Sequence, residues 1–102
     1  MNKKLGKITS AKFGRGGYQD AIMGVSLTFG GKGWGTSHFD GAFIQNEKQD
    51  QQAAYFLTLM QRVQLLLLQA KVKTLDQLVG IPVEVEFDGN VLHSFRVLTE
   101  VL

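Results

Sequence analysis

The chain has 102 residues, of which 44% are hydrophobic and 20% are charged, and this length suits one domain spanning residues 1–102. It contains no cysteine, which excludes disulfides, thiolate metal sites and cysteine nucleophiles, and no run of about 18 apolar residues that could cross a membrane. No apolar segment follows the opening Met1-Asn2-Lys3-Lys4, so we expect no signal peptide and predict a cytoplasmic protein.

Basic residues and glycines are both concentrated toward the N-terminus. Residues 1–35 carry six basic side chains and one acidic side chain. Residues 36–102 carry five basic and eight acidic side chains, so the net charge of the chain is +2. Nine of the twelve glycines fall between positions 14 and 41. A basic segment suits an anionic partner, and glycine suits tight turns or close approach of a ligand to the backbone. Lysines that only keep the surface soluble are the alternative explanation.

The N-terminal half has the alternation that is typical of β-strands. Between Met23 and Phe29 every second residue is apolar, and the residues between them are glycine, serine or threonine. The glycine-rich segment 14–20 predicts a loop, and Gly30-Gly31-Lys32-Gly33 predicts a hairpin turn. We therefore predict three strands, at residues 6–13, 23–29 and 34–44.

A long amphipathic helix is predicted over about residues 47–71. Its apolar residues recur at the three- and four-residue spacing of one helix face: Ala53, Phe56, Leu57, Met60, Val63, Leu67 and Ala70. Asn46 is the expected N-cap, with Gln49 in the capping-box position. Beyond Met60 further leucines widen the apolar arc, so we expect a second side of the helix to be buried in a homo-oligomer.

The C-terminal third predicts a short helix and two strands. Thr74 and Gln77 form a capping box, and the helix they start is expected to end at Gly80 and Pro82. A strand over 83–88 precedes an Asp88-Gly89-Asn90 turn compatible with type I′, and a last strand over 91–102 is apolar on both faces. We expect this last strand to lie centrally. The order β-β-β-α-α-β-β predicts an α+β fold: an antiparallel sheet with one long helix packed on it.

No group of residues has the pattern of a catalytic or metal site. His38 and Asp40 share a strand face, but a surface pair explains that spacing as simply as a catalytic couple does. His93 lies in the last strand, where a structural or surface role is expected. His38, Asp40 and Glu47 lack the spacing of known metal sites. We therefore predict a protein that is not an enzyme and that uses no metal or cofactor.

The glycine-rich segments are the strongest candidates for ligand binding. Neither matches a phosphate-binding template, because no helix follows residues 14–17 and no Lys-Ser or Lys-Thr pair is present. Each segment does place a cation near an aromatic residue, Arg15 with Tyr18 and Lys32 with Trp34. Such a pair can stack a base and bind phosphate. Alternatively, Tyr18 and Trp34 anchor their loops to the core. The candidate ligand-binding residues are Arg15, Gly16, Gly17, Tyr18, Gln19, Asp20, Lys32, Trp34 and His38.

Distinctive strings occur at residues 6–14, 17–21, 29–35, 80–87 and 94–102. In these strings the chain resembles a family of small uncharacterised bacteriophage and prophage proteins. The resemblance covers nearly the whole chain, least closely in the helix, and it is most specific in Gly17-Tyr18-Gln19-Asp20 and in Leu98-Thr99-Glu100-Val101-Leu102. It implies a phage-derived protein that acts in the cytoplasm of the bacterial host, and it carries over no binding or catalytic residue.

Within that context, we predict a phage accessory protein that counters host antiviral defence by binding and sequestering a small anionic nucleotide, such as a cyclic nucleotide signal. The predicted contacts to the nucleotide come from Arg15, Tyr18, Lys32 and Trp34. Gln19 and Asp20 are expected to contact its polar edges. Two alternatives stay open. One is a protein-interaction inhibitor of a host defence or replication complex. The other is a single-stranded nucleic-acid-binding module, whose affinity would fall steeply with salt.

Overall fold

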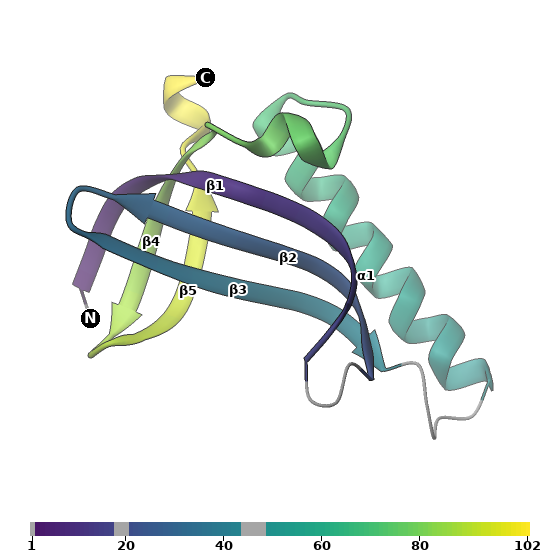
Figure 1. The fold of residues 1–102 in the computed structure, drawn as a ribbon. Helices are drawn as coiled ribbons and strands as arrows, with labels where there is room; N and C mark the ends of the chain where they lie inside the picture. The colour runs from purple at the N-terminus through teal and green to yellow at the C-terminus, as the bar shows by residue number, and fades with distance from the viewer. Residues whose placement is uncertain (1, 18–20, 44–48) are drawn as a thin grey trace.

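The computed structural model describes residues 2–17, 21–43 and 49–102 (Figure 1). Five strands form one antiparallel sheet: β1 (Asn2–Gly16), β2 (Ile22–Gly31), β3 (Trp34–Phe43), β4 (Pro82–Asp88) and β5 (Val91–Val97). One α-helix, α1 (Gln49–Ala70), and two short 3-10 helices, η2 (Leu75–Leu78) and η3 (Thr99–Val101), complete the described elements. The predicted α+β class, with an antiparallel sheet and one long helix, is confirmed.

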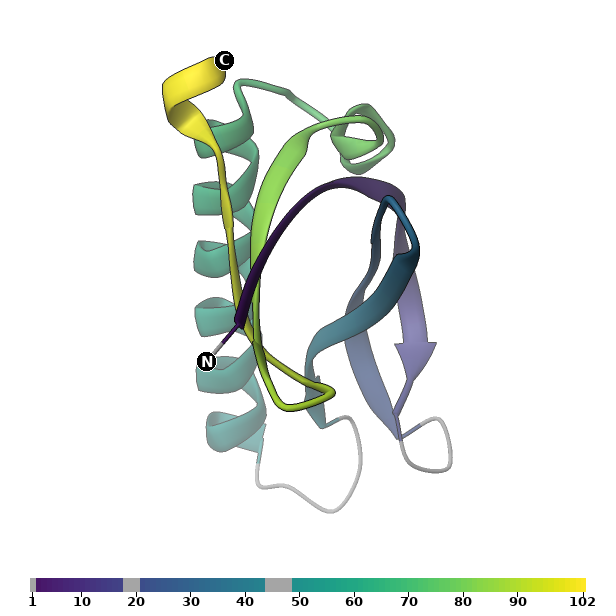
Figure 2. The same cartoon turned by 90° about the vertical axis from the view of Figure 1, so that its left-hand side faces the viewer.

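The sheet has the strand order β3-β2-β1-β4-β5, with β1 in the centre. The chain passes through three hairpin-connected strands, then crosses along α1 and returns so that β4 lies beside β1, which is a Greek-key connection. The sheet curls strongly, and its two edge strands come into contact (Figure 2). In that contact the rings of His38 on β3 and Phe95 on β5 lie 5.6 Å apart. The architecture is therefore a partly open barrel.

The curl depends on β1, which pairs with two strands in succession. Its first half bonds to β4 and its second half to β2, and Lys7 lies in both ladders, opposite Pro82 and opposite Gly30. At this bend the backbone of Gly6 closely approaches its neighbours. A Cβ on Gly6 would lie 2.5 Å from the carbonyl oxygen of Gly30 and 2.6 Å from Cζ2 of Trp34. Glycine is therefore required where β1 changes partners.

The hydrophobic core lies inside the curl. The apolar residues that alternate along β2 and β4 point inward and are buried, as their period of two predicts. Helix α1 and η2 contribute the other side of the core through Ala70 and Leu78, with Val63, Leu66 and Leu67 half-buried against it. The largest fully buried side chains are Phe29, Ile8, Leu27, Leu59, Leu78, Val83 and Val85.

The structure differs from the sequence predictions in the element bounds. β1 begins before the predicted strand and continues through Gly16, so residues 14–16 of the loop predicted over 14–20 are strand; residues 18–20 lie outside the described residues. The predicted second α-helix is the 3-10 helix η2. Thr74 makes no side-chain cap bond there, and the side-chain oxygen of Gln77 accepts a hydrogen bond from the N–H of Lys73 instead. Asn46 also lies outside the described residues.

The prediction that the last strand lies centrally is wrong, because β5 is an edge strand. Strand β5 ends at Val97, and the apolar residues beyond it continue into η3 at the C-terminal end of α1. There Lys71 Nζ donates a hydrogen bond to the carbonyl oxygen of Leu102. The β4–β5 turn also differs from type I′, because Gly89 has a positive φ of 63° and Asn90 does not.

We expect Gly6→Ala to lower the free energy of unfolding by about 1–3 kcal/mol, because the added methyl group overlaps backbone and indole atoms. Gly14→Ala, in the same strand, is the matched control. A Cβ there meets no atom within 4 Å, so the substitution is expected to be neutral or to stabilise by up to about 1 kcal/mol. Urea denaturation measures both values, and equal effects would contradict the steric explanation.

Candidate functional site

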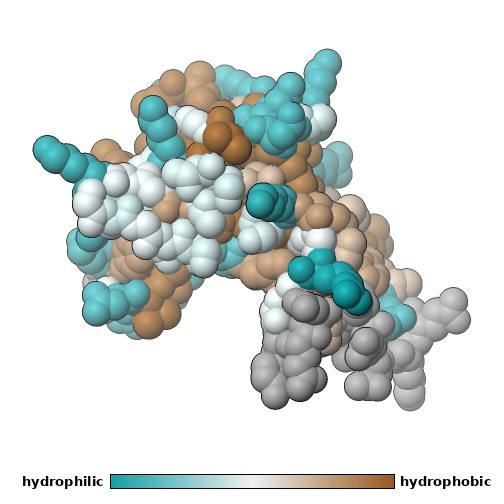
Figure 3. Space-filling view, viewed as in Figure 1, coloured by the Kyte–Doolittle hydropathy of each residue, from teal (hydrophilic) through white to brown (hydrophobic). Residues whose placement is uncertain are grey.

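The outer face of β1, β2 and β3 carries few large side chains. Because the core residues of these strands point inward, the residues between them point outward, and the strand register arranges them in rows. One row is Gly14, Gly24 and Gly41, and the next is Lys12, Ser26 and Phe39. The row after that is Ser10, Thr28 and Ser37, followed by Lys7, Gly30 and Gly35. We call these twelve residues the outer face. It faces the viewer in Figure 1, and the pale surface in Figure 3 reflects the small, near-neutral residues that predominate on this side.

Phe39 is the aromatic side chain of the outer face. A Cβ on Gly16 of β1 or on Gly41 of β3 would lie within 3 Å of atoms of the Phe39 ring. Since β2 runs between β1 and β3, a ring that reaches glycines on both strands must lie across β2. Aromatic side chains commonly cover glycines in this way in sheets. Phe39 is half-buried, so part of its ring remains accessible for a planar ligand to stack on.

Hydroxyl groups and lysines complete the outer face. The hydroxyl of Thr28 is 2.6 Å from that of Thr9 and 2.7 Å from that of Ser10, so these side chains form a short hydrogen-bonded chain. Lys7 and Lys12 are exposed, and no ion pair joins either to another described residue. None of the twelve residues is acidic. The outer face therefore has a positive charge with small polar groups between the lysines.

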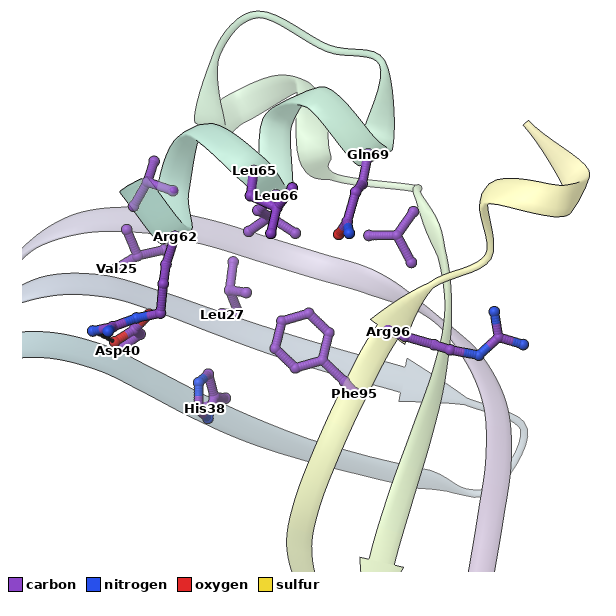
Figure 4. A pocket seen from close by; sticks show the side chains of 12 residues that line it. Val25, Leu27, His38, Asp40, Arg62, Leu65, Leu66, Gln69, Phe95 and Arg96 are labelled. Atoms are coloured by element: carbon purple, nitrogen blue, oxygen red, sulfur yellow. Dashed lines mark hydrogen bonds and ion pairs between the residues drawn. The ribbon is translucent and has the colours of Figure 1, made fainter. Parts of the chain in front are cut away.

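A second candidate site is a cavity of about 380 Å³ between α1 and the opposed edges of β3 and β5 (Figure 4). Its walls are mainly apolar and include Leu27, Leu66 and Phe95. His38 from β3 and Gln69 from α1 project toward this space, whereas the guanidinium of Arg96 extends away from it. An apolar cavity with a few polar groups at its margin is the usual form of a small-molecule site.

Both arginines beside the cavity are already paired. Arg62 donates two hydrogen bonds to the carboxylate of Asp40, at 2.8 Å from Nε and 2.7 Å from Nη2, and this hydrogen bonding raises the pKa of Arg62. Arg96 bonds to Glu84 and twice to Glu100; the hydrogen bonds from Arg96 lower the pKa of Glu100. An anionic ligand in the cavity would have to displace a carboxylate from one of these arginines. The cavity therefore suits an uncharged ligand better than a phosphate.

The residues predicted to bind ligand do not form one cluster. Arg15 pairs with Met23 at one end of the β1–β2 ladder, and Lys32 lies in the hairpin turn at the other end, roughly 30 Å of strand away. Gly16 lies beside the Phe39 ring of the outer face, and Gly17 follows the end of β1 with a positive φ of 71°. His38 lines the cavity, next to Phe95. Tyr18, Gln19 and Asp20 lie outside the described residues.

Trp34 takes the alternative role that the sequence left open, as an anchor to the core. Its indole fills the space above Gly6 and Gly31, where no Cβ could fit, and it meets the ring of Phe87 edge-on at a centroid distance of 5.7 Å. Lys4 places its ammonium 5.8 Å from the same Phe87 ring. The indole is thus half-buried and packed on the hydrophobic core.

Sequence reasoning did not single out the outer-face residues, including Phe39, Lys7 and Lys12. A signal for them was present, because small or polar residues alternate with the apolar residues of β2. By itself, that alternation indicates only that these residues lie on the face opposite the core residues. Their arrangement beside Phe39 depends on the register of three strands, which the alternation within one strand does not specify.

No family model, curated protein or solved structure matches the chain. Within residues 2–17, 21–43 and 49–102, no group of three or more His, Asp or Glu side chains is placed to hold a metal ion. In the same part of the chain, no helix is long and apolar enough to cross a membrane.

We expect Val63→Ile to raise the free energy of unfolding by about 0.8 kcal/mol, because the added methylene group enters the cavity and is buried against its apolar wall. Val91→Ile is the matched control, since Val91 is 69% exposed and an added methylene there stays in water. Thermal and urea denaturation of both variants measure the difference. A loss of stability in Val63→Ile would indicate that this wall has no free space.

Proposed function

We propose that the protein binds single-stranded nucleic acid on the outer face of β1, β2 and β3, without catalysing a reaction. The observation that carries this proposal is the composition of that face: two lysines that form no ion pair with any described residue, a chain of hydroxyl groups, and one aromatic ring close to Gly16 and Gly41. Lysines bind the phosphates, and the ring stacks a base regardless of its identity. Glycines let the nucleic acid backbone approach the sheet.

The spacing of the basic residues favours an extended ligand over a single nucleotide. Lys7 and Lys12 on the outer face and Lys32 in the hairpin turn are spread along the β1–β2 pair, whereas Arg15 lies on the inner side with Phe13. One nucleotide cannot contact both Lys12 and Lys32 across roughly 20 Å of strand. A single strand that follows the sheet can, because its phosphates repeat along its length. Sequestration of a small cyclic nucleotide is accordingly the alternative proposal.

The connectivity of the chain supports the same choice. A five-stranded, partly open Greek-key barrel is the architecture of OB-folds, which bind oligonucleotides and oligosaccharides on the face of their second and third strands. In this chain Ser26, Thr28 and Phe39 lie on that pair of strands. Architecture alone does not determine function, so the argument depends on the side chains of the face. Their positive charge favours a nucleic acid over an oligosaccharide.

The proposed biological role follows from the resemblance to bacteriophage proteins. In an infected bacterium, a protein that covers single-stranded nucleic acid would withhold it from host defence proteins. An inhibitor that acts by contacting a host defence or replication protein remains the alternative, with the exposed side of α1 as its contact surface.

We expect binding to a labelled oligothymidylate of about 16 nucleotides, the upper site size for one such fold, to weaken as salt is raised. If Lys7, Lys12 and Lys32 each contact a phosphate, the slope of log K against log salt is about −2. Lys12→Gln should reduce that slope by about 0.7, whereas the control Lys73→Gln, beyond the end of α1, should leave it unchanged. Fluorescence anisotropy measures both slopes, and equal slopes for the two variants would reject the proposed face.

Phe39→Leu should weaken oligonucleotide binding by about 1–3 kcal/mol, or roughly 5- to 150-fold, because it removes the stacking surface. Phe13→Leu is the matched control: Phe13 is 46% exposed but lies on the inner side of the same sheet. The same titrations with mononucleotides and cyclic dinucleotides separate the two ligand classes. Tight binding of a cyclic dinucleotide with no binding of the oligonucleotide would favour sequestration of a small signal instead.

A further inference from the structure

The exposed side of α1 carries an apolar stripe without a charged residue. The only charged residues in the sequence of α1 are Asp50 and Arg62, and the guanidinium of Arg62 is bound to Asp40 on β3. The large apolar side chains of the stripe are well exposed: Leu57 by 62%, Met60 by 43%, Leu65 by 54% and Leu68 by 66%. The stripe is completed by two exposed glutamines, Gln61 and Gln64.

These six residues form one continuous surface. At about 100° per residue they span roughly 140° of the helix circumference, on the side opposite the buried Leu59 and Ala70. Apolar surface of this size is unusual on a helix that faces water, where charged residues normally predominate. The absence of charge is also what distinguishes the centre of protein interfaces from other surface.

The stripe has the same sequence of residue types from either end: two large apolar residues, two glutamines and two large apolar residues. If two copies of α1 lie antiparallel about a dyad between positions 62 and 63, Leu57 faces Leu68 of the partner subunit near the centre of the stripe. Met60 and Leu65 lie about 70° to opposite sides of that centre, so each meets its own copy in the partner subunit. Gln61 then faces Gln64 of the partner subunit, where the two amides can hydrogen-bond. Every apolar side chain of the stripe meets an apolar side chain, and every amide meets an amide. A surface that is complementary to itself is what a twofold interface requires.

We propose that two copies of this chain form a homodimer through the antiparallel packing of their α1 stripes. A second copy is the fitting occupant because two identical uncharged surfaces meet without like-charge repulsion. The contact covers about 18 Å of each helix, from Leu57 to Leu68, which is at the small end of interface sizes. The dimer is therefore expected to dissociate on dilution in the micromolar range.

The dimer is compatible with the proposed function but does not depend on it. Helix α1 lies behind the sheet when the outer face is viewed from the front (Figure 1), and Figure 2 shows the helix and the β2–β3 hairpin on opposite sides of the molecule. Packing through α1 therefore leaves both outer faces exposed. A dimer that binds no nucleic acid, or a monomer that does, would separate the two proposals.

The first test measures mass by sedimentation equilibrium and light scattering over a range of concentrations. The wild-type chain should approach twice the monomer mass, and the double variant Leu57→Glu/Leu68→Glu should remain monomeric, because it places carboxylates opposite each other. Leu5→Glu is the matched control, since Leu5 is also 66% exposed but lies on β1. Circular dichroism checks that each variant is folded. A monomeric wild-type chain at millimolar concentration, or a dimer unaffected by the double substitution, would overturn the proposal.

The second test determines the direction of packing by disulfide trapping, which is specific because the chain has no cysteine. A mixture of Leu57→Cys and Leu68→Cys should form the mixed disulfide readily under mild oxidation. Leu57→Cys alone should not cross-link, because antiparallel packing holds its two copies about 16 Å apart along the helix. Ser37→Cys on the outer face controls for random collision. Rapid cross-linking of Leu57→Cys with itself would indicate parallel helices and contradict the proposed dimer.

Discussion

The fold depends on one strand being shared between two ladders. β1 bonds to β4 before Lys7 and to β2 after it, so the direction of the strand must change while its hydrogen bonds continue. Only a residue without a Cβ fits at Gly6, where Gly30 and Trp34 close in. The bend curls the sheet, and the curl lets a small chain enclose a core between β2, β4 and α1. A flat sheet of this length would leave those apolar residues exposed on one face.

The curl also determines where the molecule can bind other molecules. Inward-pointing residues of β1 to β3 are used by the core, and the rows between them form a broad outer face whose small side chains keep it accessible. On the inner side, β3 and β5 approach but do not pair, and α1 covers the gap between them. The ion pair between Arg62 and Asp40 links the helix to the β3 edge at this gap. An edge strand covered in this way is protected from pairing with another chain.

The sequence predicted the elements that depend on local pattern. The alternation in β2 and β4, the hairpin at Lys32-Gly33 and the presence of the long helix α1 each involve neighbouring residues only, and each was confirmed. The predicted apolar face of α1 was wrong in part, because Leu57 and Met60 are exposed whereas Leu59, outside that face, is buried. The first residues of β1 lack such a pattern, because Asn2 to Leu5 are all exposed; they are strand because β4 provides their hydrogen bonds. The edge position of β5 likewise depends on β1, which occupies the centre. Both features come from pairing between distant segments, and periodicity within one segment does not report it.

The candidate site was predicted less completely for the same reason. Composition indicated a basic, glycine-rich and aromatic surface in the first third of the chain, and the outer face has that character. The particular residues were different, since Trp34 points inward beside Gly31 whereas Phe39 points outward beside Ser26. If the register of β3 against β2 shifted by one residue, Trp34 and Phe39 would exchange faces, because such a shift moves every side chain of a strand to the other face. The aromatic residue available to a ligand is thus determined by the pairing of β2 with β3, and the same pairing places Asp40 on the inner side, where Arg62 binds it.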